Sequence, residues 1–331
     1  MNNRIAFDWF IALIVFSAPI LSLSVPHGGT GNYKLLIIIG LISGWSQIKK
    51  FELFEAYIFG GFLLLYFVNL FSFFGTENIS QGHTWLGKYL YLFMGLFAYA
   101  VIKDRINIII KHFDMALLVN AFLIGAIAIY QHYYLGIDRI YGNVHPILFG
   151  DVSVVILCIL VSRIFYGNSN KIMYLGVISC LIGAVFSQSR GALIAIPIVL
   201  AVLYFITYSY RSKQSKIFLT MAILIIIIAS SFKGSPVRER INYTITDLKS
   251  YMESTDKAGP LTIRFEFWKN SIILWKQNPL LGIGPGDYNI EMKRLIDSGN
   301  ASNNNAMNYA WTPHSNLINA IVTSGLLGLF V

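Results

Sequence analysis

The chain has 331 residues, of which 56% are hydrophobic and 12% are charged, and its formal net charge at pH 7 is +9. Soluble domains carry about twice this share of charged residues, so the composition excludes an ordinary soluble domain. The excess of Lys and Arg forms no basic patch with interleaved aromatic residues, which argues against a nucleic-acid partner. The sequence therefore predicts an all-α polytopic membrane protein.

The hydrophobic residues are grouped in runs that approach the roughly 20 helical residues needed to cross a membrane. The predicted spans are 9–25, 33–48, 53–74, 85–102, 112–130, 147–166, 172–187, 192–210, 217–231 and a last one from 316 onward. Alternate connections hold most of the Lys and Arg residues, whereas the short connections on the other side hold only Arg139 and Arg190. Because Lys and Arg are enriched in cytoplasmic connections, we expect a cytoplasmic N-terminus and an outer segment at 232–315.

The predicted organisation has three parts. Residues 1–231 form a transmembrane bundle of about nine spans, residues 232–315 form one large periplasmic loop, and residues 316–331 begin a further span. The loop is the most polar part of the chain, with 10 Lys and Arg and 8 Asp and Glu residues between 232 and 313. The final hydrophobic run stops at Val331 without flanking charges, so we expect the natural chain to continue there.

Two cations on the outer side are not explained by topology. Arg190 lies in the short connection 188–191, where its side chain must stay near the membrane surface. It is either an interfacial anchor or a ligand for phosphate, whose oxygens match the planar guanidinium fork. Arg139 is predicted to be a second outer cation that binds phosphate or sugar.

Residues 261–277 have the pattern of a helix that lies in the membrane interface. One face of it holds Phe265, Trp268, Ile272 and Trp275. Arg264 would sit beside this face, where it either pairs with a headgroup or with Glu266, or contacts a substrate phosphate. We assign Trp268 to substrate binding.

A glycine cluster follows this helix, and it includes Gly282, Gly284 and Gly286. Such clusters are often only turns. The alternative is a nest of backbone N–H groups for an anion, in which Gly284 and Gly286 would contact the substrate.

His314 is the predicted general base. If Thr312 caps the last span, Pro313 is the first helical residue and His314 lies in the first turn. The positive end of the helix dipole would then lower the pKa of His314 and leave the imidazole neutral at pH 7. Asn316, two residues further on, is assigned to substrate binding.

These motifs resemble the bacterial O-antigen ligase family. His314-Ser315, followed after nine residues by Gly325 and then by Gly328-Leu329, fits the histidine pattern of these ligases. The Arg264 helix with its glycine cluster resembles the large periplasmic loop of the wider O-antigen ligase and polymerase superfamily, and Ser189-Arg190-Gly191 matches its earlier arginine motif. The resemblance implies a fold like that of C-type membrane glycosyltransferases, with about a dozen spans.

The resemblance also implies the reaction. The donor would be a polysaccharide on undecaprenyl diphosphate, and the acceptor a sugar hydroxyl of lipid A core, at the bacterial inner membrane. His314 would be the base, while Arg190 and Arg264 would stabilise the charge of the leaving diphosphate. The sequence contains no Asp-x-Asp pair, so we expect direct, inverting displacement without a metal or another cofactor.

Two other functions are compatible with the sequence. An O-antigen or other surface-polysaccharide polymerase would use the same donor with a second lipid-linked glycan as its acceptor. A transporter of lipid-linked oligosaccharide would need ionisable residues within its spans, and the predicted spans carry almost none. The histidine pattern favours the ligase.

Overall fold

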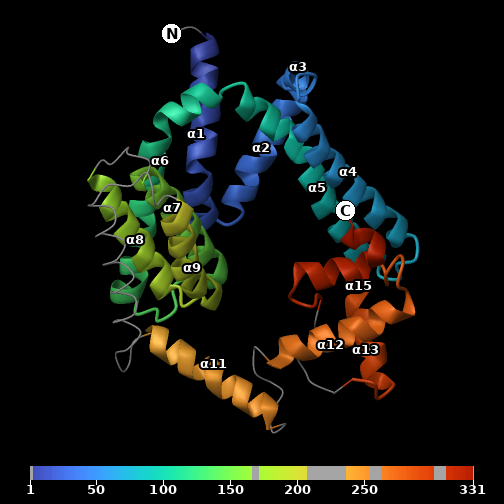
Figure 1. Ribbon diagram of the computed structural model, residues 1–331. Helices are drawn as coiled ribbons and strands as arrows, with labels where there is room; N and C mark the ends of the chain where they lie inside the picture. The colour runs from blue at the N-terminus through green and yellow to red at the C-terminus, as the bar shows by residue number, and fades with distance from the viewer. Residues whose placement is uncertain (1–2, 166–170, 207–235, 254–261, 302–310, 331) are drawn as a thin grey trace. The chain divides into compact units, whose positions relative to one another are not determined.

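The computed structural model describes residues 3–165, 171–206, 236–253, 262–301 and 311–330 (Figure 1). Within these ranges the protein is helical and has no strand. The longer helices are α1 (Asn3–Ser24), α2 (Gly28–Ser43), α4 (Leu53–Phe73), α5 (Ile79–Lys103), α6 (Ile106–Ile129), α7 (Pro146–Phe165), α8 (Ile172–Phe186), α9 (Arg190–Ile206), α11 (Pro236–Met252), α12 (Thr262–Gln277), α13 (Tyr288–Asp297) and α15 (Asn316–Leu329). A single helical turn, α3 (Trp45–Ile48), and a π-helix, η1 (Tyr130–Tyr134), complete the described elements.

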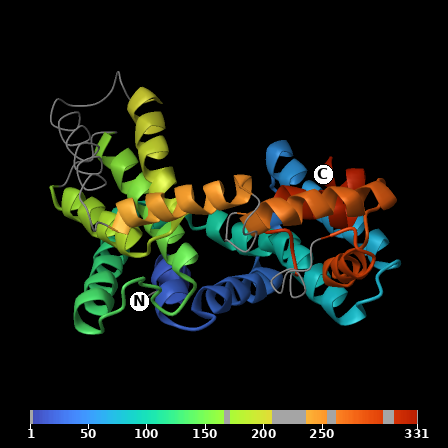
Figure 2. The ribbon, with the colours of Figure 1, turned by 90° about the horizontal axis from the view of Figure 1, so that it is seen from below.

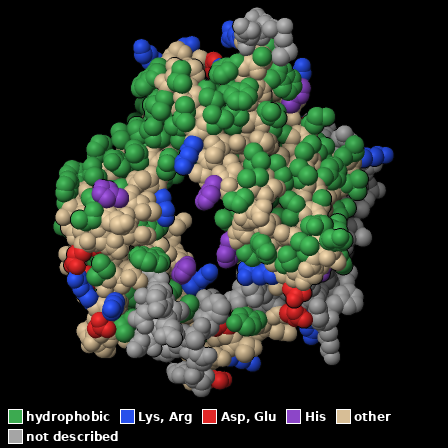
Figure 3. Space-filling view, turned by 180° about the vertical axis from the view of Figure 1, so that it is seen from behind, with side chains coloured by type: hydrophobic (Ala, Val, Ile, Leu, Met, Phe, Trp, Pro, Cys, Tyr) green, Lys and Arg blue, Asp and Glu red, His purple; other side chains and the backbone are tan. Residues whose placement is uncertain are grey.

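Several of these helices can cross a membrane. Five are long and apolar enough, namely Arg4–Ser24, Leu53–Phe73, Ile79–Lys103, Ile106–Tyr134 and Pro146–Phe165. Three shorter apolar helices are Ile172–Phe186, Gly191–Leu203 and Asn316–Leu329. Hydrophobic side chains also cover much of the visible surface, where charged residues appear only in small groups (Figure 3). These features confirm the prediction of an all-α membrane protein, while the count of ten spans stays a prediction.

Several predicted boundaries differ in the structure, and one predicted span cannot be compared. The predicted span 33–48 is interrupted at Gly44, which separates α2 from α3 because glycine weakens a helix. Helix α5 begins six residues before the predicted Trp85, since Asp287 binds the backbone at its start. The predicted span 217–231 lies outside the described residues.

The chain divides into two compact units, each made of two segments. Unit 1 contains residues 1–43 and 100–242, and unit 2 contains residues 44–99 and 243–331. The sequence predicts a division at residue 231, between the bundle and the loop. In the structure, much of the predicted loop belongs to the same unit as α4 and α5.

Helices α6, α7, α8 and α9 build the core of unit 1. Small residues bring them close, as is common in membranes. A Cβ atom added to Gly125 would lie 2.9 Å from the Cβ of Ser179, and one added to Gly183 would lie 2.4 Å from the Cγ2 of Ile124. Cys180 is fully buried in the same core, where it packs as a small hydrophobic residue.

The hydrophobic cluster of unit 2 lies between α12, α13 and α15. It consists of Phe267, Leu274, Ile283, Tyr288, Met292, Leu295 and Val322. Helix α12 packs against α15 (Figures 1 and 2), and α15 also packs against α4. This packing holds the start of α15 beside the first turn of α12.

Candidate functional site

The turn before α15 carries His314. Ser315 is the cap of this helix, with extended backbone angles and an Oγ that accepts the N–H of Ile318 at 3.4 Å. The prediction that Thr312 caps the helix is therefore wrong, because its Oγ1 instead accepts the N–H of His314 at 3.4 Å. His314 precedes the helix and has a φ of 54°, which is unusual for a residue other than glycine.

His314 lies against the second turn of α12, one helical turn from Arg264, whose charge acts on the imidazole. Partial burial, followed by the positive charge of Arg264, lowers the pKa of His314 below its usual value of 6.5. The predicted direction of the pKa shift is thus confirmed. Its cause differs from the prediction, because burial and the charge of a guanidinium lower the pKa, whereas His314 does not lie in the first helical turn. The ring of Phe267 lies 5.6 Å from the imidazole and contributes to this burial. A neutral imidazole at pH 7 can accept a proton, and the adjacent guanidinium can bind an anion.

Trp268 fixes the segment that leads to His314. Its indole Nε1–H donates to the carbonyl oxygen of Pro313 at 3.0 Å, across 45 residues of sequence. The polar atom of Trp268 is thus engaged by the protein itself, so the structure gives this residue a positioning contact. Its predicted role in substrate binding stays a prediction.

Helix α12 begins one residue after the predicted start and ends where expected, at Gln277. Its buried face consists of Thr262, Glu266, Phe267, Asn270, Ser271 and Leu274. The predicted aromatic face lies elsewhere on the helix, with Ile272 on it 51% exposed. Ile272 is therefore available to a membrane interface, whereas Phe265, Trp268 and Trp275 on the same face are only partly exposed.

The glycine cluster after α12 packs against α15. The N–H groups of Ile283 and Gly284 donate to the carbonyl oxygens of Val322 and Thr323 at 2.9 and 3.0 Å. The amide of Gly284 is therefore not available to an anion, which contradicts the proposed nest at this position. Gly286 is explained by packing as well, since a Cβ atom there would lie 2.6 Å from the nitrogen of Gly82.

The second glycine motif forms the other half of this contact. Gly325 interrupts α15 with a φ of 63°, and a Cβ atom on it would lie 2.2 Å from the carbonyl oxygen of Leu280. The next amide, that of Leu326, donates to the carbonyl oxygen of Pro279 at 2.9 Å. The two glycine motifs identified in the sequence are thus packing partners that fix α15 relative to α12.

Asp287 is a structural residue of this unit that sequence reasoning missed. Its carboxylate is 3% exposed and accepts the N–H groups of Glu77 and Asn78, both at 2.8 Å. These amides precede α5 and have no partner within the helix, so Asp287 stabilises its start. The position of Asp287 directly after Gly286 was the available signal, but its partner is about 210 residues away.

The two other predicted arginines belong to unit 1. Arg190 is the first residue of α9, and the Nε of Arg139 donates to the carbonyl oxygen of Ser187 at 3.2 Å. A second bond, from Gln188 Nε2 to the carbonyl oxygen of Asp138 at 3.0 Å, joins the same two connections. The segments that carry Arg139 and Arg190 therefore lie together, as expected for connections on one side of a membrane.

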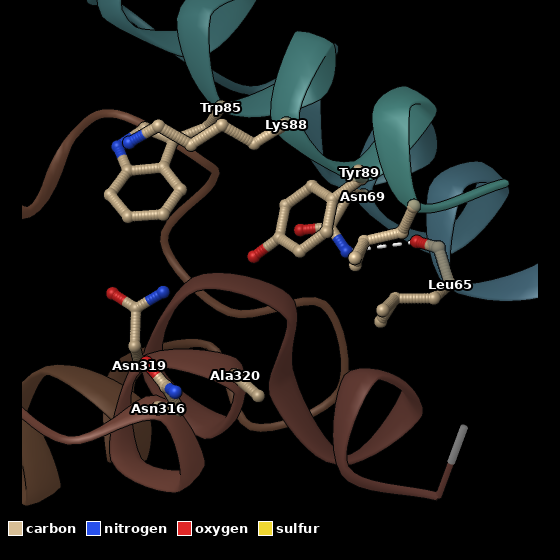
Figure 4. A pocket seen from close by; sticks show the side chains of 9 residues that line it. Leu65, Asn69, Trp85, Lys88, Tyr89, Asn316, Asn319 and Ala320 are labelled. Atoms are coloured by element: carbon tan, nitrogen blue, oxygen red, sulfur yellow. Dashed lines mark hydrogen bonds between the residues drawn. The ribbon is translucent and has the colours of Figure 1, made fainter. Parts of the chain in front are cut away.

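A cavity of about 380 Å³ lies between α4, α5 and α15 in unit 2 (Figure 4). It is lined by Leu65, Asn69, Trp85, Lys88, Tyr89, Leu92, Asn316, Asn319 and Ala320. Of these, only Asn316 was predicted as a site residue. Trp85 was predicted only as the start of a span, and nothing in the sequence indicated that α5 and α15 face each other.

These features define a class: a multi-pass helical membrane protein with polar site residues at the ends of its apolar helices. The family follows from comparison, because residues 175–331 match the family model described as O-antigen ligase. The matched region includes Arg190, Arg264 and His314, so the residues from 175 onward are similar to the O-antigen ligase family, as their motifs predict.

A relative has also been found in Haemophilus influenzae. It is an uncharacterized protein that is 24% identical to this chain over 218 residues. The match covers 63% of this chain and 54% of the relative, so the chain spans about half the length of that protein.

Proposed function

We propose that the protein is an O-antigen ligase that transfers a polysaccharide from undecaprenyl diphosphate to a sugar hydroxyl of lipid A core. The observation that carries this proposal is the pairing of His314, whose pKa is lowered, with the guanidinium of Arg264 in a segment that matches the O-antigen ligase family. A neutral base and a cation whose charge acts on it are what this transfer requires.

In the proposed reaction, a ring nitrogen of His314 takes the proton of the acceptor hydroxyl. The hydroxyl oxygen then forms a bond with the anomeric carbon of the donor, while the bond between this carbon and the phosphate oxygen breaks. The electron pair leaves with undecaprenyl diphosphate, and attack from the opposite face inverts the anomeric carbon. Arg264 stabilises the charge that grows on the leaving group.

Arg190 is proposed to bind the same diphosphate, and Arg139 to bind a phosphate or a core sugar. Support comes from the arginine motif of Arg190, which the family match includes, and from the bonds between its connection and that of Arg139. We further propose that the protein lies in the inner membrane with its N-terminus in the cytoplasm and residues 232–315 in the periplasm. The reaction is proposed to be metal-independent.

Reconstitution with defined lipids tests this function. The purified protein should move glycan from undecaprenyl diphosphate to lipid A core in detergent, where no compartments exist. Transfer to a second lipid-linked glycan instead would identify a polymerase, and no transfer in either assay would contradict the proposal. Deletion of the gene gives an independent readout, because loss of a ligase leaves bare core, whereas loss of a polymerase leaves core capped by one repeat.

A further inference from the structure

The cavity between α4, α5 and α15 combines an aromatic surface with neutral hydrogen-bonding groups. Trp85 and Tyr89 come from α5, and the carboxamides of Asn316 and Asn319 come from the first turns of α15. Figure 4 shows the Trp85 ring and the Asn319 carboxamide extending toward each other across the cavity, with the Tyr89 hydroxyl also directed into it. Within the part of the chain that the structure describes, no carboxylate lines this cavity.

This lining matches the chemistry of a sugar ring. A pyranose has a face of C–H groups, which the negative face of an aromatic ring attracts, and a rim of hydroxyl groups that hydrogen-bond to amides. The cavity volume of about 380 Å³ lies at the small end of the range for ligand cavities, which suits one or two sugar rings.

The walls of the cavity are held in place. Lys88 Nζ lies 3.7 Å from the centre of the Trp85 ring, a cation–π contact that restrains the indole. Asn69 joins α4 to α15, because its Oδ1 accepts the hydroxyl of Ser324 at 2.7 Å and its Nδ2 donates to the carbonyl oxygen of Leu65 at 2.9 Å. The amide of Asn69 is thus structural, whereas those of Asn316 and Asn319 are placed to contact a ligand.

One residue that lines the cavity lies close in sequence to the proposed base. His314 precedes Asn316 by two residues, so their Cα atoms are within about 7 Å of each other. The charge of Arg264 acts on His314 from the side of α12, whereas the cavity lies between α15 and the pair α4 and α5. With the donor diphosphate at Arg264, the cavity is left for the sugar that supplies the hydroxyl.

The geometry points to this cavity as the binding site for the acceptor sugar, with Trp85 as the stacking surface and Asn316 and Asn319 as hydroxyl ligands. The inference rests on the proposed ligase function for the identity of the sugar. It adds a substrate subsite formed by α5 and α15, and it gives the end of α5 at Trp85 a function besides crossing the membrane.

Two measurements on the purified full-length chain test the subsite. Calorimetric titration with lipid-free core oligosaccharide gives binding, and the transfer assay gives the KM of acceptor and donor separately. Trp85→Leu and Asn319→Leu should each weaken oligosaccharide binding and raise the acceptor KM by about 10-fold, the effect of one lost hydrogen bond or stacking contact, with the donor KM unchanged. Trp85→Phe retains an aromatic face and should lose less than Trp85→Leu.

Leu90→Ala is the matched control on α5, because Leu90 is exposed and does not line the cavity. Thermal unfolding of each variant distinguishes a lost contact from a damaged fold, and Asn319→Ala is a second truncation if Asn319→Leu unfolds. Folded variants that bind the oligosaccharide and show an acceptor KM as the wild type does would overturn the subsite. Variants that bind undecaprenyl phosphate more weakly but bind the oligosaccharide normally would also overturn it. Oligosaccharide binding without any transfer would retain the subsite and contradict the proposed ligase.

Discussion

The hydrogen bond between Trp268 and Pro313 should control the reactivity of His314, and Trp268→Phe removes its N–H donor while it keeps an aromatic ring at this position. A hydrogen bond of this kind contributes about 1 kcal/mol. A residue such as His314, with a φ of 54°, costs ~1–3 kcal/mol of backbone strain that its surroundings must offset. The variant therefore loses a stabilising free energy comparable to this strain, and the turn that carries His314 should relax to a less strained conformation. Since a shift of about 1 Å at a reacting group costs roughly 100-fold, we expect transfer to slow by about 10- to 100-fold.

The pH profile of transfer adds a readout that a merely structural role would not change. Only neutral His314 accepts a proton, so the rate should fall as the pH drops through its pKa, which lies below 6.5 in the wild type. Relaxation of the turn exposes the imidazole, raises its pKa and moves this acid limb to higher pH. Trp275→Phe is the matched control, because Trp275 Nε1 donates to the carbonyl oxygen of Pro279 at 3.1 Å on the same helix. Equal rates and acid limbs for the two variants would refute the reasoning.

Three further changes test the architecture and the cation. Asp287→Ala should lower the free energy of unfolding by about 2 kcal/mol, because two partly buried amides before α5 lose their acceptor, and a denaturant titration in detergent measures this. Gly325→Ala should destabilise the protein by about 2 kcal/mol or more, since the new methyl meets a carbonyl oxygen at positive φ, whereas Gly87→Ala on α5, with open space at its Cβ position, should not; equal melting temperatures would contradict this packing. Arg264→Lys should nearly abolish transfer because a point charge replaces a bidentate fork, and full activity would indicate that generic charge suffices.

The sequence predicted what local patterns determine. Hydrophobic runs located α4, α7 and α8 within a residue or two, because a membrane-spanning helix satisfies its own backbone and needs little from its neighbours. The motifs also identified His314 and Arg264, and in the structure the charge of Arg264 acts on His314. These features depend on short stretches of sequence or on a pattern shared by a family.

Contacts between distant segments were not predictable in the same way. The cap of α5 by Asp287 spans about 210 residues, and the glycine cluster was interpreted as an anion nest because its partner, the break of α15 at Gly325, is visible only in three dimensions. The sugar cavity was missed for the same reason, since Trp85 and Asn319 become neighbours only when α15 packs beside α4 and α5.

The most direct test of the central claim is the rate of a single round of transfer by wild type and His314→Ala, with donor and acceptor both saturating. We expect the variant to insert and fold normally and to lose about 10²- to 10⁴-fold in rate, the contribution of a positioned general base. His83→Ala is the control, because His83 is an exposed histidine of the same unit, with its ring 4.9 Å from that of Phe73. Transfer by His314→Ala at the wild-type rate would contradict the assignment of His314 as the base.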